Sequence, residues 1–220
     1  MPLLALGAAL SLLAAAPASA DDVPRGAGNA HEAHGHVESA AAEPGADLVG
    51  RPAPAWSFER WIGTAPLSLE SLRGKVVLVR WWTDGCRYCA ATLPALETLR
   101  ARHARDGLVV IGAYHPKPPR AVSDRRILAF AARLGFDGPI AVDGEWSTLE
   151  RYWLAPHPES GWTSVSFLID RDGIIRWVHG GGEYHPSSDP AHARCDLEYH
   201  GLERAVAAAL AAPAAARTMQ

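Results

Sequence analysis

The sequence predicts an α/β protein, a three-layer sandwich in which helices flank a central mixed β-sheet. Two largely apolar strand patterns, 76–82 and 108–114, enclose a helical pattern, and this order is typical of a right-handed βαβ unit. Two further strand patterns, 165–169 and 174–179, flank the turn residues 170–173 and indicate an antiparallel hairpin. A parallel unit combined with a hairpin predicts strands of both directions in one sheet.

The other elements follow from local patterns. In chain order, we expect an edge strand at 56–61, a helical turn at 67–72, a helix from the cysteines to about residue 105, a helix at 124–134, a strand at 139–142, a helix at 145–153 and a last helix at 197–210. Ser123 and Asp124 can cap the helix at 124–134, and Gly135 can end it. The strand at 139–142 and the helix after it form one inserted βα element before the hairpin.

The two ends of the chain lack the pattern of a folded core. Residues 3–16 are a short apolar run before Ala18-Ser19-Ala20, which predicts a signal peptide cleaved after Ala20 and an exported, periplasmic or extracellular protein. Residues 21–47 contain few bulky apolar side chains and predict a disordered linker. The predicted domains are a signal peptide at 1–20, the linker at 21–47, the folded domain at 48–212 and a disordered tail at 213–220.

The charge and the histidines restrict the choice of partners. The formal net charge of −3 gives no reason to expect binding to nucleic acid or to an anionic membrane surface. The predicted linker contains His31, His34 and His36, which either hold a transition metal weakly or are solvated without a specific ligand. We expect a monomer.

Cys86 and Cys89 are the strongest chemical signal in the chain. They lie three residues apart at the start of a predicted helix, so that they share one face and can be joined by a disulfide. The positive end of the helix dipole favours a thiolate at Cys86. A structural disulfide is the alternative, but a loop of two intervening residues constrains the unfolded chain very little. The spacing therefore favours a redox pair.

The residues around the cysteines extend this pattern. Trp82 stands four residues before Cys86, and Pro94 stands five residues after Cys89. With these positions, the segment resembles the active site of the thioredoxin superfamily, and most closely its exported TlpA-like branch of redoxin or AhpC/TSA type. The resemblance implies a thioredoxin-like fold and a thiol–disulfide oxidoreductase with Cys86 as nucleophile and Cys89 as resolving thiol. It implies no cofactor besides the disulfide, protein thiols and disulfides as substrates, and a membrane thiol-redox partner.

Two features near the cysteines depart from the pattern of this family: the two residues that separate the cysteines, and one residue of the preceding strand. Arg87 and Tyr88 separate the cysteines, and the cation of Arg87 should stabilise the thiolate of Cys86 and make the protein more oxidising. Arg80 stands six residues before Cys86, where thioredoxins place a buried acid. A guanidinium that points inward there requires a carboxylate partner, for which we consider Glu97 and Asp143.

Gly85 stands directly before Cys86, where the family has a tryptophan, and a further departure lies before the hairpin. Ser164, preceded by Thr163, stands where the family has a cis-proline that faces the two cysteines. A cis peptide bond before a non-proline residue costs about 3 kcal/mol, so we expect this bond to be trans or the loop to be rebuilt. The altered loop could open the dithiol to a metal.

Three other functions remain open. Thr83 and Cys86 form half of a peroxidatic T-x-x-C motif, for which Arg80 or Arg87 could supply the arginine, although Val79 stands where that motif has a proline. His185, His192 and Cys195 could form a site for copper or zinc. Otherwise Cys195 is a buried inert thiol or pairs between molecules. The domain could also bind a partner without redox turnover.

Overall fold

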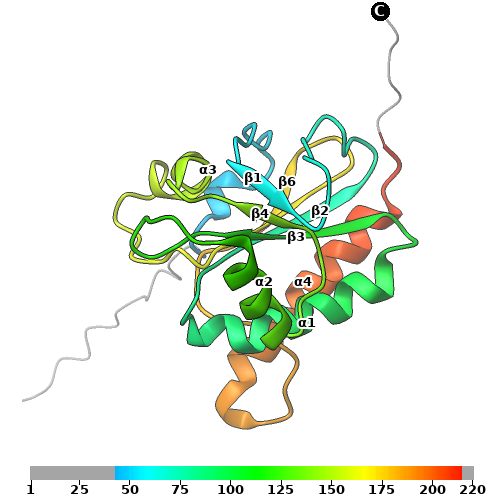
Figure 1. Ribbon diagram of the computed structural model, residues 1–220. Coiled ribbons are helices and arrows are strands. Elements are labelled where there is room, and N and C mark those ends of the chain that lie inside the picture. The colour runs from blue at the N-terminus through cyan, green and yellow to red at the C-terminus, as the bar shows by residue number, and fades with distance from the viewer. Residues whose placement is uncertain (1–42, 215–220) are drawn as a thin grey trace, which may run out of the picture. The chain divides into compact units, whose positions relative to one another are not determined.

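The computed structural model describes residues 43–214; the predicted signal peptide, most of the predicted linker and residues 215–220 lie outside this range. Six strands form one sheet in the order β1-β4-β3-β2-β5-β6 (Figure 1). Their bounds are β1 (Arg60–Ile62), β2 (Val76–Trp82), β3 (Leu108–Tyr114), β4 (Ile140–Val142), β5 (Ser166–Ile169) and β6 (Ile175–His179). The pairs β2–β3 and β3–β4 are parallel, whereas β1–β4, β2–β5 and β5–β6 are antiparallel. The predicted mixed sheet is therefore confirmed.

Helices cover both faces of this sheet (Figure 1). One face carries α1 (Arg87–His103), α2 (Asp124–Arg133) and α4 (Ala193–Ala211); the other carries η1 (Ala46–Leu48), α3 (Ser147–Leu149) and a π-helical turn, η2 (Glu150–Leu154). A 3-10 turn, η3 (Pro190–His192), leads into α4. Two apolar clusters fill the layers between the sheet and these helices. This arrangement confirms the predicted three-layer α/β sandwich.

The central strand β2 explains why the two layers form. All seven of its residues are buried, and successive side chains of a strand point to opposite faces. Leu78 and Trp82 belong to the cluster beneath α1 and α4, whereas Val77 and Trp81 belong to the cluster on the opposite face. Because both faces are covered, an apolar run without polar alternation is the pattern that such a strand requires.

Of the two predicted elements near the start of the domain, one differs from the prediction. The edge strand contains only Arg60–Ile62, since Trp56 donates its indole N–H to the carbonyl of Leu67 at 2.8 Å and lies outside the sheet. The segment 67–72 forms the predicted helical turn, in which the backbone N–H of Leu72 donates to the carbonyl of Ser68 at 3.1 Å. Ser68 and Ser71 there also exchange bonds between hydroxyl oxygens and backbone N–H groups at 2.9 and 3.0 Å.

Two later helices also have other bounds than expected. Trp146 has a left-handed φ of 62°, so α3 begins only at Ser147 and continues as the π-helical turn. The last helix begins at Ala193, four residues before the predicted start at 197, because the 3-10 turn η3 leads directly into it. These shifts leave the topology unchanged and place Cys195 in the first turn of α4.

The described part of the predicted linker packs on the domain. Gly45 is buried, and Asp47 in η1 accepts a hydrogen bond from the Nε2 atom of His157 at 3.0 Å. Between residues 43 and 214, no helix has the length and apolar character needed to cross a membrane.

Candidate active site

Cys86 and Cys89 lie at the amino end of α1 and form a disulfide, with their Cα atoms 5.4 Å apart. Cys86 is the N-cap residue, and its sulfur accepts a hydrogen bond from the backbone N–H of Cys89 at 3.2 Å. Cys86 is partly exposed, whereas Cys89 is fully buried. The sulfur that can meet a substrate is therefore also the one that faces the positive helix end, where a thiolate is stabilised.

The turn before α1 positions this sulfur. Gly85 has a φ of 78°, a conformation that glycine adopts without steric cost, so the chain can leave β2 and enter the helix at Cys86. Asp84 is anchored in the same turn by the hydroxyl of Tyr114 at 2.9 Å and by Arg120 at 2.8 Å and Arg126 at 3.1 Å. Burial acts to raise the pKa of Asp84, but these donors outweigh it and hold the pKa below its usual value.

Ser164 faces the disulfide from the loop before β5. Its hydroxyl oxygen lies 3.4 Å from Sγ of Cys86 and 3.8 Å from Sγ of Cys89. The cis peptide bond found among residues 43–214 is Lys117–Pro118, so the bond before Ser164 is trans. The loop thus places a hydroxyl group beside the sulfurs.

His115 holds this loop in place from the end of β3. Its Nε2 atom lies 3.1 Å from the carbonyl oxygen of Thr163 and donates to it, since a carbonyl can only accept. The imidazole is fully buried and packs edge-on against Trp146, with ring centroids 5.3 Å apart. Burial lowers the pKa of His115 to about 4. His115 is therefore neutral at physiological pH, and its role at the site is to position the loop.

Arg80 points into the protein beneath the site. Its guanidinium donates to the carbonyl of Gly182 at 2.7 Å and to the hydroxyl of Ser166 at 3.3 Å, and it lies 5.3 Å from the ring centroid of Tyr184. The side chain is completely buried, which lowers the pKa of Arg80, while the interaction with Tyr184 acts in the opposite direction. Arg80 thus ties β2 to the segment that follows β6.

The expectation of a carboxylate partner for Arg80 is wrong. Glu97 pairs with Arg100 on α1, with the closest contact at 2.5 Å. Asp143 accepts the indole N–H of Trp81 at 3.0 Å and two backbone N–H groups of α3. Within residues 43–214, no carboxylate lies at ion-pair distance from Arg80, because a carbonyl, a hydroxyl and an aromatic ring surround its guanidinium instead.

A cleft of about 370 Å³ opens beside Cys86 and is lined by both loops of the site. Tyr88 and Trp162 stand at its wall, with their rings edge-on and their centroids 5.3 Å apart. Arg87 donates to the hydroxyl of Tyr88 at 2.6 Å and lies over its ring, 4.6 Å from the centroid. The arrangement forms an accessible aromatic rim next to the exposed sulfur, which suits an extended polypeptide better than a small enclosed ligand.

The two other residues of the sequence motif have supporting positions. Trp82 is fully buried and packs edge-on against Tyr114, with ring centroids 5.0 Å apart. Pro94 lies inside α1 on its exposed side, and its carbonyl accepts from the hydroxyl of Thr98 at 3.0 Å. Trp82 therefore supports the strand end, and Pro94 lies in the helix that presents the cysteines.

The structure also brings together the candidate metal ligands His185, His192 and Cys195, and it adds Glu183 to them. Cys195 is a free thiol and only partly buried. Burial, followed by the charges of Glu183 and Glu198, raises the pKa of Cys195. This cluster lies outside the disulfide site.

Sequence reasoning did not identify three residues that shape these sites. Trp162 lies in a loop that contains no recognisable motif. Only the structure shows that its side chain is 44% exposed, which marks it as a candidate contact for a substrate. Asp84 lies two residues before Cys86 in the sequence, but its three donors come from β3, from the following loop and from α2. Glu183 lies two residues before His185 in the sequence, but its spacing from the candidate ligands matches no known metal-binding motif.

Fold and site together define a thioredoxin-like protein with a disulfide at the start of the active-site helix. The sequence profile of the AhpC/TSA family matches residues 49–178, and the chain belongs to this family. It is 33% identical over 127 residues to protein DipZ of Mycobacterium bovis, covering 56% of this chain and 17% of DipZ. It is 26% identical over 110 residues to the thiol-disulfide oxidoreductase ResA of Geobacillus kaustophilus, covering 50% of this chain and 57% of ResA.

A solved structure has the same fold. A thiol-disulfide isomerase from Corynebacterium glutamicum superposes with a TM-score of 0.54 at 24% identity, over 73% of this chain and 97% of the isomerase. The chain spans less than two thirds of the length of DipZ and of ResA. The thioredoxin-like fold that the sequence resemblance implied is therefore confirmed.

Proposed function

We propose that this protein is a thiol–disulfide oxidoreductase that exchanges disulfides with other proteins through Cys86 and Cys89. The observation that carries the proposal is the position of the pair: one sulfur partly exposed at the helix start, the other fully buried and bonded to it. A relative named thiol-disulfide oxidoreductase supports the same activity. The cleft beside Cys86 provides room for a polypeptide substrate.

The reaction follows from the geometry of the pair. In the reduced protein, the thiolate of Cys86 attacks one sulfur of a substrate disulfide and releases the other sulfur as a thiolate. The thiolate of Cys89 then attacks the Cys86 sulfur of the mixed disulfide, releasing the second substrate thiol and restoring the Cys86–Cys89 bond. Two electrons pass to the substrate, and the two protons of the dithiol end on the two substrate thiols. The reverse sequence oxidises a substrate dithiol.

Four groups of this chain would stabilise the Cys86 thiolate. The backbone N–H of Cys89 and the hydroxyl of Ser164 both lie within hydrogen-bond distance of its sulfur. The positive end of α1 adds to them, and the cation of Arg87 is the next residue in the chain. Each of these favours the reduced form, so we expect a protein more oxidising than one without them.

The setting of the reaction belongs to the same proposal. The pattern of residues 1–20 supports export, which would place the protein among disulfide-containing substrates. A membrane thiol-redox partner would recycle the dithiol, and the reaction needs no cofactor besides the disulfide itself. We expect the protein to act as a monomer.

The reduction potential of the pair, measured against glutathione, tests the proposal. We expect one two-electron couple, with the same potential in the wild-type protein and in Cys195→Ser. A value near −270 mV (about the thioredoxin value) would mark a reductant, and one near −120 mV (about the DsbA value) an oxidant. Exchange with a substrate protein should stop in Cys86→Ser, while Cys89→Ser should accumulate the mixed disulfide. If Cys86 and Cys89 form no reversible disulfide, the proposal fails.

Peroxide reduction is the rival activity for a member of this family. A peroxidatic site needs an arginine near the reactive sulfur, but Arg80 donates to Gly182 and Ser166, and Arg87 donates to Tyr88. We therefore expect slow reaction of Cys86 with hydrogen peroxide. Stopped-flow measurement on the reduced protein separates the two activities, because rapid consumption of peroxide would favour the peroxidase.

A further inference from the structure

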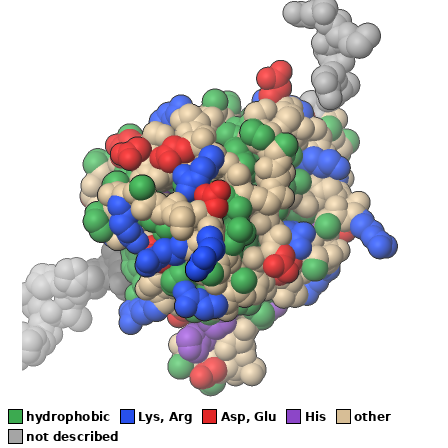
Figure 2. Space-filling model, viewed as in Figure 1, with side chains coloured by type: hydrophobic (Ala, Val, Ile, Leu, Met, Phe, Trp, Pro, Cys, Tyr) green, Lys and Arg blue, Asp and Glu red, His purple; other side chains and the backbone are tan. Residues whose placement is uncertain are grey.

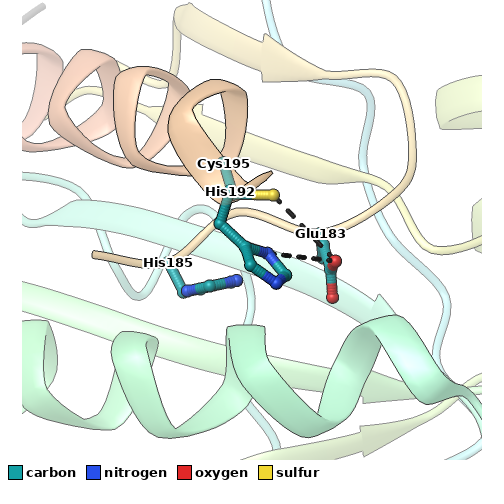
Figure 3. A group of neighbouring side chains, drawn as sticks. All are labelled: Glu183, His185, His192 and Cys195. Carbon is teal, nitrogen blue, oxygen red and sulfur yellow. Dashed lines mark hydrogen bonds and ion pairs between the residues drawn. The ribbon is translucent and has the colours of Figure 1, made fainter. Parts of the chain in front are cut away.

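A second group of reactive side chains lies between β6 and α4. The atoms of Glu183, His185, His192 and Cys195 that can bind a metal all lie within 4.8 Å of one another. Figure 3 shows the four side chains converging, two from the segment after β6 and two from the turn and helix that follow. We call these four residues the loop cluster. Figure 2 shows histidine side chains at the surface over the segment that precedes α4.

The local backbone explains why the four side chains meet. His192 ends η3 and Cys195 lies in the first turn of α4, three residues later, so both face the same side. Glu183 and His185 stand on either side of the buried Tyr184 in a segment without regular secondary structure, and their ligand atoms lie on the same side. The backbone N–H of His185 donates to the carbonyl of Cys195 at 3.3 Å, which joins the two segments.

His185 provides an independent sign that a ligand is expected here. Its Nδ1 atom lies 3.1 Å from the carbonyl oxygen of Pro186 and must donate to it, so the proton is on Nδ1 and Nε2 carries a lone pair. That Nε2 atom is buried and has no hydrogen-bond partner within the described residues. A buried acceptor without a partner is unfavourable, and a histidine whose other nitrogen donates to a carbonyl is the usual form of a metal ligand.

The distances in the loop cluster fit a small tetrahedral site. An oxygen of Glu183 lies 3.8 Å from Nδ1 of His192 and 4.0 Å from Sγ of Cys195. Bond lengths to zinc of about 2.0–2.3 Å place neighbouring ligands of a tetrahedron roughly 3.3–3.8 Å apart. These two contacts therefore need to contract by about half an ångström, and the most distant pair in the cluster, within 4.8 Å, by roughly one ångström, which side-chain rotation can supply.

We propose that the loop cluster binds one zinc ion through Glu183, His185, His192 and Cys195. Thiolate, imidazole and carboxylate are the ligands that zinc takes in proteins, and four protein ligands complete its tetrahedron. A closed site of this kind is structural. Cys195 gives up its proton on binding, so it is held as a zinc thiolate and is withdrawn from disulfide exchange.

Hydrogen bonds from the residues on either side of Glu183 connect the loop cluster to the strand and the helix of the disulfide site. The carbonyl of Gly182 accepts from Arg80 of β2, and the backbone N–H of Tyr184 donates to the hydroxyl of Thr92 in α1 at 3.2 Å. A zinc ion would therefore fix the segment before α4 against the helix that carries the cysteines.

Cobalt substitution on the full-length protein tests the zinc site. The protein is prepared with the Cys86–Cys89 disulfide intact and Cys195 reduced, so that Cys195 is the one thiol available. We expect one equivalent of Co²⁺ to produce a thiolate-to-cobalt charge-transfer band and tetrahedral d–d bands, and one equivalent of Zn²⁺ to abolish both. Zn²⁺ should also raise the melting temperature, since it binds the folded state.

Matched variants assign the ligands. Cys195→Ser should lose the charge-transfer band, and His185→Ala or His192→Ala should weaken Zn²⁺ binding at least about tenfold. His200→Ala, on α4 outside the cluster, should bind as the wild type does. The triple variant His31→Ala, His34→Ala, His36→Ala should also bind unchanged.

Two outcomes would overturn the proposal. One is a wild-type protein that gives no thiolate-to-cobalt band and no zinc-dependent rise in melting temperature. The other is zinc binding that survives in Cys195→Ser but is lost when the three predicted-linker histidines are replaced. If a histidine variant folds poorly, the test still holds, because the effect of Zn²⁺ on the melting temperature of the wild-type protein then decides whether the site exists.

Discussion

Replacement of Ser164 by alanine removes the hydroxyl that faces both active-site sulfurs. That oxygen lies 3.4 Å from Sγ of Cys86 and 3.8 Å from Sγ of Cys89, and Ser164 is buried. In the reduced protein, the hydroxyl can donate to the Cys86 thiolate. The alanine variant loses this donor and keeps the backbone N–H of Cys89, which lies 3.2 Å from the same sulfur.

The size of the effect follows from one hydrogen bond to a charged group. Such a bond contributes about 1.5–3 kcal/mol, and since sulfur is a weak acceptor we take the lower end of that range. One pKa unit corresponds to about 1.4 kcal/mol, so Ser164→Ala should raise the pKa of Cys86 by about one unit. Because the bond stabilises the reduced form, its loss should also lower the reduction potential by about 30 mV.

The pH dependence of Cys86 alkylation by iodoacetamide measures the shift directly. The reduced protein is alkylated over a range of pH, and the modified cysteine is identified by mass spectrometry. Thr163→Val is the matched control, because it removes the neighbouring hydroxyl and leaves Ser164 in place. An unchanged midpoint in Ser164→Ala would refute the role of the hydroxyl, and so would an equal shift in the control.

Two further replacements test the support of the site. His115 has a pKa of about 4 in the folded protein against 6.5 for a free imidazole, so below pH 6.5 the unfolded chain takes up a proton that the folded chain does not. The wild-type free energy of unfolding should therefore fall by about 3 kcal/mol between pH 6.5 and 4 relative to His115→Gln, measured by urea titration; equal pH profiles would contradict a buried neutral imidazole. Gly112→Ala would place a Cβ atom 2.8 Å from the indole nitrogen of Trp82 and should cost about 1–3 kcal/mol, whereas Gly161→Ala, with open space around it, should unfold like the wild type. A harmless Gly112→Ala would show that the packing around Trp82 can adjust.

The elements next to the cysteines were predictable because their signals are local. The strand pattern at 76–82 corresponds residue for residue to β2, since a strand covered on both faces needs a largely apolar run, which here contains one charged residue, Arg80. Cys86 and Cys89 stand at the helix start, and a spacing of three on a helix sets their separation without any help from the rest of the chain. The apolar run and the spacing belong to the sequence itself.

Element ends were less predictable where a side chain or a strand partner decides them. The edge strand has three residues because β4, its only partner in the sheet, also has three. The helical turn at 67–72 stays a single turn, in which Ser68 and Ser71 bond to each other's backbone. A short stretch of sequence does not reveal the length of the strand that will pair with it, nor the side-chain conformation that a serine will adopt.

The sequence by itself determined the fold class, the pair of cysteines that forms the disulfide and the helix that presents it. Tertiary structure alone decided that a guanidinium is buried among a carbonyl, a hydroxyl and an aromatic ring, and that Glu183 joins two histidines and Cys195. These groups come from segments far apart in the chain or from an irregular loop. Their distances depend on how loops fold back over the sheet, and no local periodicity encodes that path.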